Sequence, residues 1–304
     1  MFRRFSYNNY TLSPMSIYAF NNSNSIQSKP NNDINNKTRE NIIGSIINER
    51  VPTDYYIINK WSHMKTEIKK YVNLLHDGKA YKNIKCEHKG GRGTSYDFMF
   101  IFSYDDNSQK HVKVELKFNA LSIDDAPQFV SPAKPSRFMK NAENISYEEF
   151  FYNNYLPTLS KASGLSMPSK QEYISTINSN KPLCMEAYKS LYKTDATFNG
   201  LANEQYRKSV RSYVERTELD IELLTEYLTK TQRDKYYMLY DTNKNEFILE
   251  KAVMDDYKIE SVSKHPKKYS YECKSKSGKK LNVLLRWKNG NGIAFPAFQI
   301  SSRL

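Results

Sequence analysis

The fold prediction starts from residues 95–118, SYDFMFIFSYDDNSQKHVKVELKF. Segments 95–103 and 111–118 are rich in aromatic and β-branched residues, and the turn-forming string DDNS at 105–108 lies between them. Two such segments joined by turn residues are typical of a β-hairpin. Side chains alternate between the two faces of a strand, so a hairpin also predicts which residues lie next to one another.

The register of this hairpin brings two carboxylates together. Pairing Asp97 with Glu115 centres the hairpin on residue 106, inside the turn, and Lys117 then lies one step along the same face as Glu115. Adjacent carboxylates repel each other, so a bound divalent cation is expected to stabilise the pair. Mg²⁺, with Mn²⁺ as a substitute, suits one Asp and one Glu completed by water and phosphate oxygens. The alternative is a surface salt bridge, worth about 0–1 kcal/mol.

The strings YD at 96–97 and ELK at 115–117 resemble the motif of the PD-(D/E)XK nuclease superfamily, over less than a third of the chain. This resemblance implies a restriction-endonuclease-like αβββαβ core. It also implies that Asp97 and Glu115 bind Mg²⁺ while Lys117 assists the attacking water. A tyrosine stands at position 96, where a proline is frequent in the superfamily.

Two further catalytic residues are expected from the same resemblance. Many members carry a glutamate on the first core helix, and Glu67 is the first candidate for it, with Glu49 or Glu40 as alternatives. Gln128 lies just past the second strand, where related nucleases place a polar residue. A solvated helix charge and a plain loop amide remain the alternative interpretations of Glu67 and Gln128.

The segments on either side of the hairpin predict a mixed fold. A helix is expected to begin at Thr38, a second helix to cover 54–76, and a short strand to cover 81–88. Residues 170–232 are mainly helical in pattern, and 235–304 returns to strands separated by turn signals. The prediction is an α/β (α+β) protein with a helical insertion and an antiparallel β C-terminal region.

The same patterns predict four regions along the chain. Residues 1–37 hold nine asparagines and little periodicity, so they are expected to form a disordered Asn/Ser-rich leader, with an organellar targeting segment as the alternative. A nuclease core is expected over 38–160 and a helical region over 161–232. Residues 233–304 are expected to form a β-rich region that contacts DNA.

Composition narrows the class of partner and compartment. The chain has 304 residues, and 46 Lys and Arg against 33 Asp and Glu give a net charge of +13. This excess favours a polyanion such as nucleic acid as the partner, although an AT-rich coding sequence also produces a Lys-rich surface.

Three scattered cysteines and no CxxC pair disfavour a disulfide scaffold or a structural zinc site. The sequence lacks an apolar run of membrane-spanning length, so an intracellular protein of cytoplasm, nucleus or virus is expected without a membrane partner.

Several basic residues are candidates for nucleic-acid contacts. One lies in a glycine-rich loop, three lie at helical spacing with Tyr206 and Tyr213 nearby, and two flank a tryptophan near a turn. A solvated charged face is the alternative for each group. The candidates are Arg92; Arg207, Lys208 and Arg211; and Arg286 and Lys288.

These features predict a metal-dependent endonuclease that acts on nucleic acid, with double-stranded DNA as the expected substrate. An RNA endonuclease and a non-catalytic nucleic-acid-binding protein on a nuclease-like scaffold remain the alternatives. A homodimer is also left open, because the region after residue 170 exceeds what a minimal catalytic core requires.

Overall fold

The computed structural model describes most of the chain, in two compact units. Unit 1 comprises Met1–Ala126 and Thr231–Ala252, and unit 2 comprises Pro127–Lys230 and Val253–Leu304. The described residues are 3–21, 29–76, 80–90, 94–125, 129–130, 135–141, 146–179, 182–265, 269–287 and 291–302.

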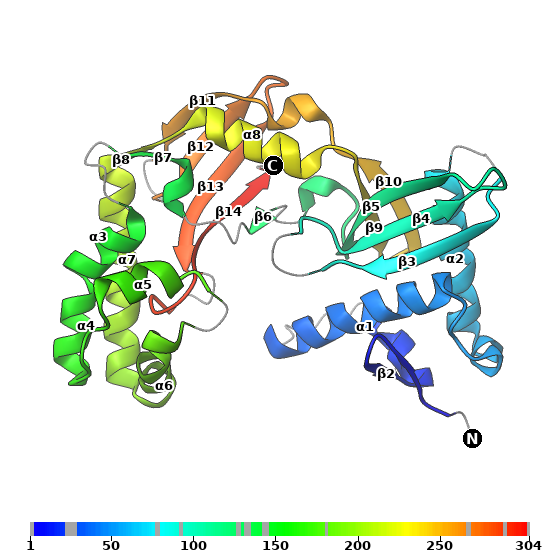
Figure 1. The fold of residues 1–304 in the computed structure, drawn as a ribbon, viewed down its shortest axis with the longest axis horizontal. Coiled ribbons are helices and arrows are strands. Elements are labelled where there is room, and N and C mark those ends of the chain that lie inside the picture. Colours follow the sequence, from blue (N-terminus) through cyan, green and yellow to red (C-terminus); the bar gives the residue numbers. More distant parts are fainter. Residues whose placement is uncertain are drawn as a thin grey trace. The chain divides into compact units, whose positions relative to one another are not determined.

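Unit 1 is built on a five-stranded sheet with the strand order β10-β9-β5-β4-β3 (Figure 1). Strands β3 (Asn83–His88), β4 (Phe98–Ser103) and β5 (Gln109–Phe118) form an antiparallel meander. Strand β9 (Lys235–Asp241) runs parallel to β5, and β10 (Glu246–Lys251) runs antiparallel to β9. Because two parallel strands need a crossover connection, the whole chain between β5 and β9 acts as that connection.

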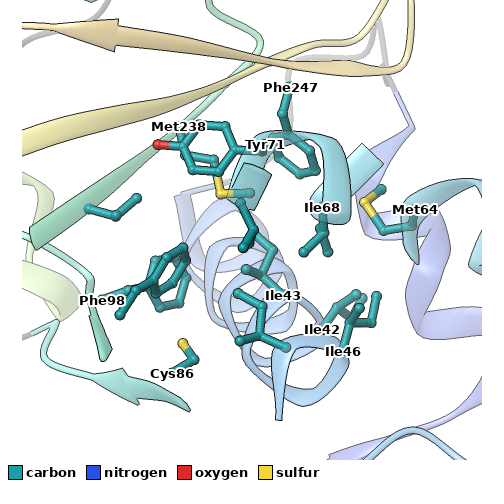
Figure 2. Close-up of a cluster of buried hydrophobic side chains, with 14 of the residues drawn as sticks. Ile42, Ile43, Ile46, Met64, Ile68, Tyr71, Cys86, Phe98, Met238 and Phe247 are labelled. Carbon is teal, nitrogen blue, oxygen red and sulfur yellow. The ribbon is translucent and has the colours of Figure 1, made fainter. Parts of the chain in front are cut away.

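Two helices, α1 (Lys29–Ile47) and α2 (Asn59–Leu75), pack against this sheet and form the core of unit 1 with it. Their apolar side chains recur every three or four residues, and every second residue of β4, beginning at Phe98, is buried. Figure 2 shows side chains of both helices packed together with side chains from the strands, among them Phe98, Met238 and Phe247. Helix α1 contacts β3, whereas α2 contacts β10, so the two helices lie along different parts of the sheet.

The N-terminal segment is ordered, so the prediction of a disordered leader over 1–37 is wrong for residues 3–21. Strands β1 (Phe5–Tyr7) and β2 (Tyr10–Leu12) form a hairpin, and the 3-10 helix η1 (Pro14–Phe20) follows. Leu12, Ile17 and Phe20 are fully buried in the core of unit 1. These few apolar residues have no regular spacing, and their burial depends on the helices and strands that receive them.

The predicted region boundaries also change. The expected core over 38–160 ends at Ala126 and is completed by Thr231–Ala252, so β9 and β10 belong to the first sheet and not to a separate region over 233–304. Helix α1 starts at Lys29, before Thr38. The expected helix over 54–76 is a 3-10 turn followed by α2. Strand β9 belongs to the first sheet because it pairs in parallel with β5, a segment far away in the chain. Local sequence patterns do not predict such a pairing.

Unit 2 contains a second five-stranded sheet, with helices packed against it (Figure 1). Trp287 is fully buried, and its ring packs against Tyr147 and Phe151 at centroid distances of 5.9 and 4.8 Å. The sheet order is β11-β12-β13-β14-β6, and β7 pairs separately with β8. The strands are β6 (Phe129–Val130), β7 (Met139–Asn141), β8 (Thr217–Leu219), β11 (Ile259–Lys264), β12 (Tyr271–Ser275), β13 (Lys280–Trp287) and β14 (Pro296–Ser302). The helices are α3 (Tyr147–Asn154), α4 (Leu156–Ser163), α5 (Lys170–Thr176), α6 (Glu186–Thr194), α7 (Ala196–Arg216) and α8 (Ile221–Gln232), which continues to the start of the second segment of unit 1.

The mixed α/β class predicted from the sequence is confirmed by these helices and sheets. Within the parts of the chain that the structure describes, every helix is too short or too polar to span a lipid bilayer.

Candidate active site

The β4–β5 hairpin has the register that its turn predicts. Phe98 pairs with Val114, a register that centres the hairpin on residue 106, and Asp97 directly precedes β4. The backbone N–H of Asp97 donates to the carbonyl oxygen of Val114 at 3.0 Å, which holds Asp97 against β5 although the regular register ends at Phe98. In the turn, Asn107 adopts a positive φ of 63°, a conformation that asparagine tolerates well. The local chemistry of the turn therefore places the two carboxylates together.

Asp97 is a half-buried acid whose charge interacts with that of Glu115. Its Oδ2 atom accepts a hydrogen bond from the backbone N–H of Leu116 at 2.8 Å. Burial, and then the negative charge of Glu115, raises the pKa of Asp97 to about 6. A carboxyl group held in this way is costly to ionise, and a nearby cation lowers that cost.

Glu115 is held between two lysines. Its Oε1 atom lies 2.5 Å from Nζ of Lys117, and its Oε2 atom lies 2.5 Å from Nζ of Lys235. The side chain of Lys117 is 18% exposed, whereas that of Lys235 is 1% exposed. Lys235 Nζ also donates to the backbone carbonyl oxygen of Ser95 at 2.9 Å. Burial lowers the pKa of Lys235, and the charge of Glu115 opposes that shift.

A third carboxylate reaches this site from helix α1. Burial, and then the negative charge of Asp97, raises the pKa of Glu40 to about 7. Both side chains lie over Gly90, because a Cβ atom built there would be 3.6 Å from Asp97 Oδ1 and 3.8 Å from Glu40 Oε2.

Glu67, the first candidate for a helical glutamate, is placed elsewhere. It is buried on α2, forms an ion pair with Lys70 at 2.7 Å, and acts electrostatically on Tyr240 in the core. Helix α2 packs against β10, at the other end of the sheet order from β3 and β4. Glu40, an alternative in the sequence prediction, takes the position expected of Glu67 because α1 packs beside β3.

Lys235 was missed by sequence reasoning. It is the first residue of β9 and is 120 residues from Glu115 in the chain. The only available signal was a lysine at the start of an otherwise aromatic and apolar segment, KYYMLYD. Gln128, Arg92 and Lys288 lie outside the described residues, so the structure does not place them.

Three predicted nucleic-acid contacts lie on one exposed face of α7 in unit 2. Lys208 pairs with Glu204 at 2.6 Å, and Arg211 pairs with Glu215 at 3.1 Å, so these cations are partly neutralised. Arg207 is also exposed. The neighbouring ring of Tyr213 is buried and is not available for stacking on bases.

The last predicted contact, Arg286, is half-buried on β13. Its Nη1 atom donates to Oε1 of Gln299 on the neighbouring strand β14. The adjacent Trp287 is a core residue. Of the two contacts predicted within 286–288, the structure therefore describes one, and that arginine is only partly exposed.

The hairpin β12–β13 carries a different basic feature. Lys274 and Lys280 are exposed and lie directly opposite each other in the antiparallel register. The turn lysines beside them are neutralised, since Lys279 pairs with Asp256 at 3.1 Å and Lys276 lies 3.9 Å from Asp255. Among the described residues, Lys274 and Lys280, called the lysine pair below, have no ion-pair partner.

Two carboxylates of unit 1 are of the type that binds a divalent cation with few protein ligands. In the described parts of the chain, no group of three or more His, Cys, Asp or Glu side chains is gathered as a complete metal-ligand set. Asp97 and Glu115 would supply two carboxylates, and Mg²⁺ commonly completes its shell with water and phosphate oxygens.

No family model, curated protein or solved structure matches this chain.

Proposed function

We propose that this protein is a metal-dependent endonuclease that hydrolyses phosphodiester bonds in DNA. The observation that carries the proposal is the hairpin that holds Asp97 just before β4 and Glu115 on β5, close enough for their charges to interact, with Lys117 on the carboxylate of Glu115. Unit 1 has helices α1 and α2, the antiparallel strands β3, β4 and β5, and then β9 parallel to β5 after a long connection that includes α8, and this arrangement supports comparison with the αβββαβ core of restriction-endonuclease-like proteins.

Asp97 and Glu115 are the residues that would hold Mg²⁺ or Mn²⁺. Their mutual repulsion and burial favour a divalent cation, as the raised pKa of Asp97 indicates. When bound, such a cation polarises a phosphoryl oxygen and lowers the pKa of a bound water.

Two other side chains have suitable roles beside these ligands. The ammonium group of Lys117 is partly exposed and can stabilise negative charge on a phosphate. Glu40, with a pKa raised to about 7, can accept or release a proton at its carboxylate near neutral pH. Together with the ligands, these groups supply charge stabilisation and proton transfer, which are the requirements of phosphodiester hydrolysis.

A nucleic-acid substrate is supported by charge. The chain carries a net charge of +13, and neutralised phosphates release counterions from the polymer. The lysine pair of unit 2 adds a specific feature, because like charges directly opposite each other on a sheet are destabilising unless an anion lies between them. Unit 2 is therefore proposed to contact the phosphate backbone. DNA is chosen over RNA on the resemblance to the nuclease superfamily.

Cleavage of plasmid DNA tests this function. Wild-type protein with Mg²⁺ or Mn²⁺ is expected to convert supercoiled plasmid to nicked or linear forms. Asp97→Ala and Lys117→Ala are each expected to lower the rate at least about 100-fold, the scale of losing one electrostatic donor in an active site. Asp105→Ala is the matched control, because Asp105 is an exposed carboxylate in the turn of the same hairpin.

The alternatives give different results in the same assay. Cleavage of an RNA substrate but not DNA identifies an RNA endonuclease. Salt-sensitive DNA binding without metal-dependent cleavage identifies a binding protein on a nuclease-like scaffold. Equal cleavage by wild type and by both active-site variants, each shown to be folded by circular dichroism, overturns the proposal.

A further inference from the structure

We propose that Lys235 is a positioning residue that holds Glu115 by Oε2, leaving Oε1 for the metal ion and Lys117 for the substrate. This inference rests on the proposed function, because it assigns the two oxygens of the same carboxylate. It starts from an asymmetry: two lysines lie at the same 2.5 Å from Glu115, but they are anchored very differently.

Lys235 is fixed on several sides. Its side chain is 1% exposed, and Nζ has a second acceptor in the carbonyl oxygen of Ser95 at 2.9 Å. The same nitrogen lies 4.9 Å from the ring centroid of Tyr237, which gives an additional cation–π contact. The hydroxyl of Tyr237 donates to Oε1 of Gln232, which ties β9 to the end of the preceding helix.

Lys117 has fewer constraints. Its side chain is 18% exposed, so its ammonium group can be hydrated when it leaves the carboxylate. A buried ammonium group that loses its ionic partner has no such compensation. Lys117 is therefore the lysine that would yield Oε1 to a divalent cation, while Lys235 would keep its contact with Oε2.

Lys235 also connects the two strands that carry the acids. Ser95 lies two residues before Asp97, and Lys235 joins the backbone there to the side chain of Glu115. Through this bridge, a residue on the neighbouring parallel strand β9 fixes the distance between Asp97 and Glu115. Partners that orient a metal ligand typically change metal affinity or activity 10–100-fold when they are removed.

Manganese binding to the full chain, without nucleic acid, tests the assignment of the two lysines. Lys117→Met removes the competitor for Oε1, so calorimetry is expected to show Mn²⁺ binding about tenfold tighter than in wild type, while cleavage is lost. Lys235→Met is expected to show no such tightening and to lower kcat about 10–100-fold with little change in KM for DNA. Lys235→Arg, which keeps the charge, is expected to restore kcat to within about tenfold of wild type.

A measurement on the wild-type protein tests the same inference without relying on variants that must fold. Acetylation of lysine amines, mapped by mass spectrometry, is expected to become faster at Lys117 when Mg²⁺ is added, because its ammonium group leaves Glu115. Lys235 is expected to stay unmodified with or without Mg²⁺, because it remains buried.

Two results separate this inference from the proposed function. Tighter Mn²⁺ binding in Lys235→Met than in Lys117→Met, or Mg²⁺-dependent acetylation of Lys235 in place of Lys117, overturns the inference while metal-dependent cleavage stands. Absence of Mn²⁺ binding and of cleavage in wild type overturns both.

Discussion

The Nζ atom of Lys235 lies 2.5 Å from Oε2 of Glu115, although 120 residues separate them in the chain. The contact forms because β9 pairs in parallel with β5, after a connection that contains the first part of unit 2. The surroundings of Glu115 are therefore complete only when a late segment of the chain returns to the first sheet.

Asp97→Asn is expected to stabilise the protein at pH 8 in metal-free buffer. Burial, followed by the charge of Glu115, raises the pKa of Asp97 to about 6 in the folded state. The folded protein then binds more protons than the unfolded chain between about pH 4 and pH 6, so stability is lost as pH rises through this window. Asparagine avoids the penalty, which is on the order of 2–3 kcal/mol from about 1.4 kcal/mol per pKa unit.

Urea unfolding of both proteins with EDTA at pH 8 and pH 4 measures this effect. The gain is expected at pH 8 and is expected to vanish at pH 4, where Asp97 is protonated in the folded state. A gain of equal size at the two pH values would show that the ionised carboxylate is not its cause.

Addition of Mg²⁺ or Mn²⁺ at pH 8 is expected to raise the Tm of wild-type protein. A ligand that binds only the folded state stabilises it by about 2.7 kcal/mol at 100 times its Kd. Scanning calorimetry with increasing metal concentration measures the shift. Asp105→Asn should keep the shift and Asp97→Asn should lose it, and an equal shift in both variants would place the metal elsewhere.

Gly44→Ala is expected to destabilise unit 1 by about 1–3 kcal/mol, the usual cost of overpacking. Alanine normally favours a helix over glycine by about 1 kcal/mol, but a Cβ atom at Gly44 on α1 would overlap the ring of His88 and lie 2.8 Å from the hydroxyl oxygen of Tyr7. Gly200→Ala on α7 is the control, because a Cβ atom there meets nothing within 4 Å. Chemical denaturation should show opposite signs, and stabilisation by both substitutions would contradict the close packing at Gly44.

Phe20→Ala is expected to cost about 3–5 kcal/mol, as for other buried phenylalanines. Phe20 is fully buried and packs edge-on against the ring of Tyr240 at 4.9 Å. Met15, in the same short helix η1, is 68% exposed, so Met15→Ala should change stability by less than about 0.5 kcal/mol. Equal, small effects on the unfolding free energy would mean that the N-terminal segment does not belong to the core.

Neutralising the lysine pair, with Lys274→Gln and Lys280→Gln together, is expected to weaken duplex DNA binding. Each lost phosphate contact lowers the slope of log K against log salt by about 0.9, so the pair should lower it by about 1.8. The control replaces Lys276 and Lys279, which removes the same net charge from lysines that already pair with acids. Fluorescence anisotropy over a salt series measures both, and equal losses would indicate a general charge effect.

Local sequence was sufficient for the hairpin that carries the acids. The turn around Asn107 sets the pairing of β4 with β5, and the observed register is centred on residue 106 as predicted. Both rules act within 24 consecutive residues, 95–118, so no distant part of the chain was needed to apply them. The mixed α/β class followed in the same way from periodic patterns in successive segments.

Long-range packing was needed to choose among the remaining candidates. Glu40 lies on α1 and Glu67 lies on α2. Because α1 contacts β3 whereas α2 contacts β10, Glu40 and not Glu67 lies beside Asp97. Lys235 entered the site through parallel pairing of β9 with β5, and Phe20 entered the core without any periodic pattern around it. Spacing along a chain fixes which side chains share a face of one element, but the docking of that element depends on apolar surfaces buried jointly with distant segments.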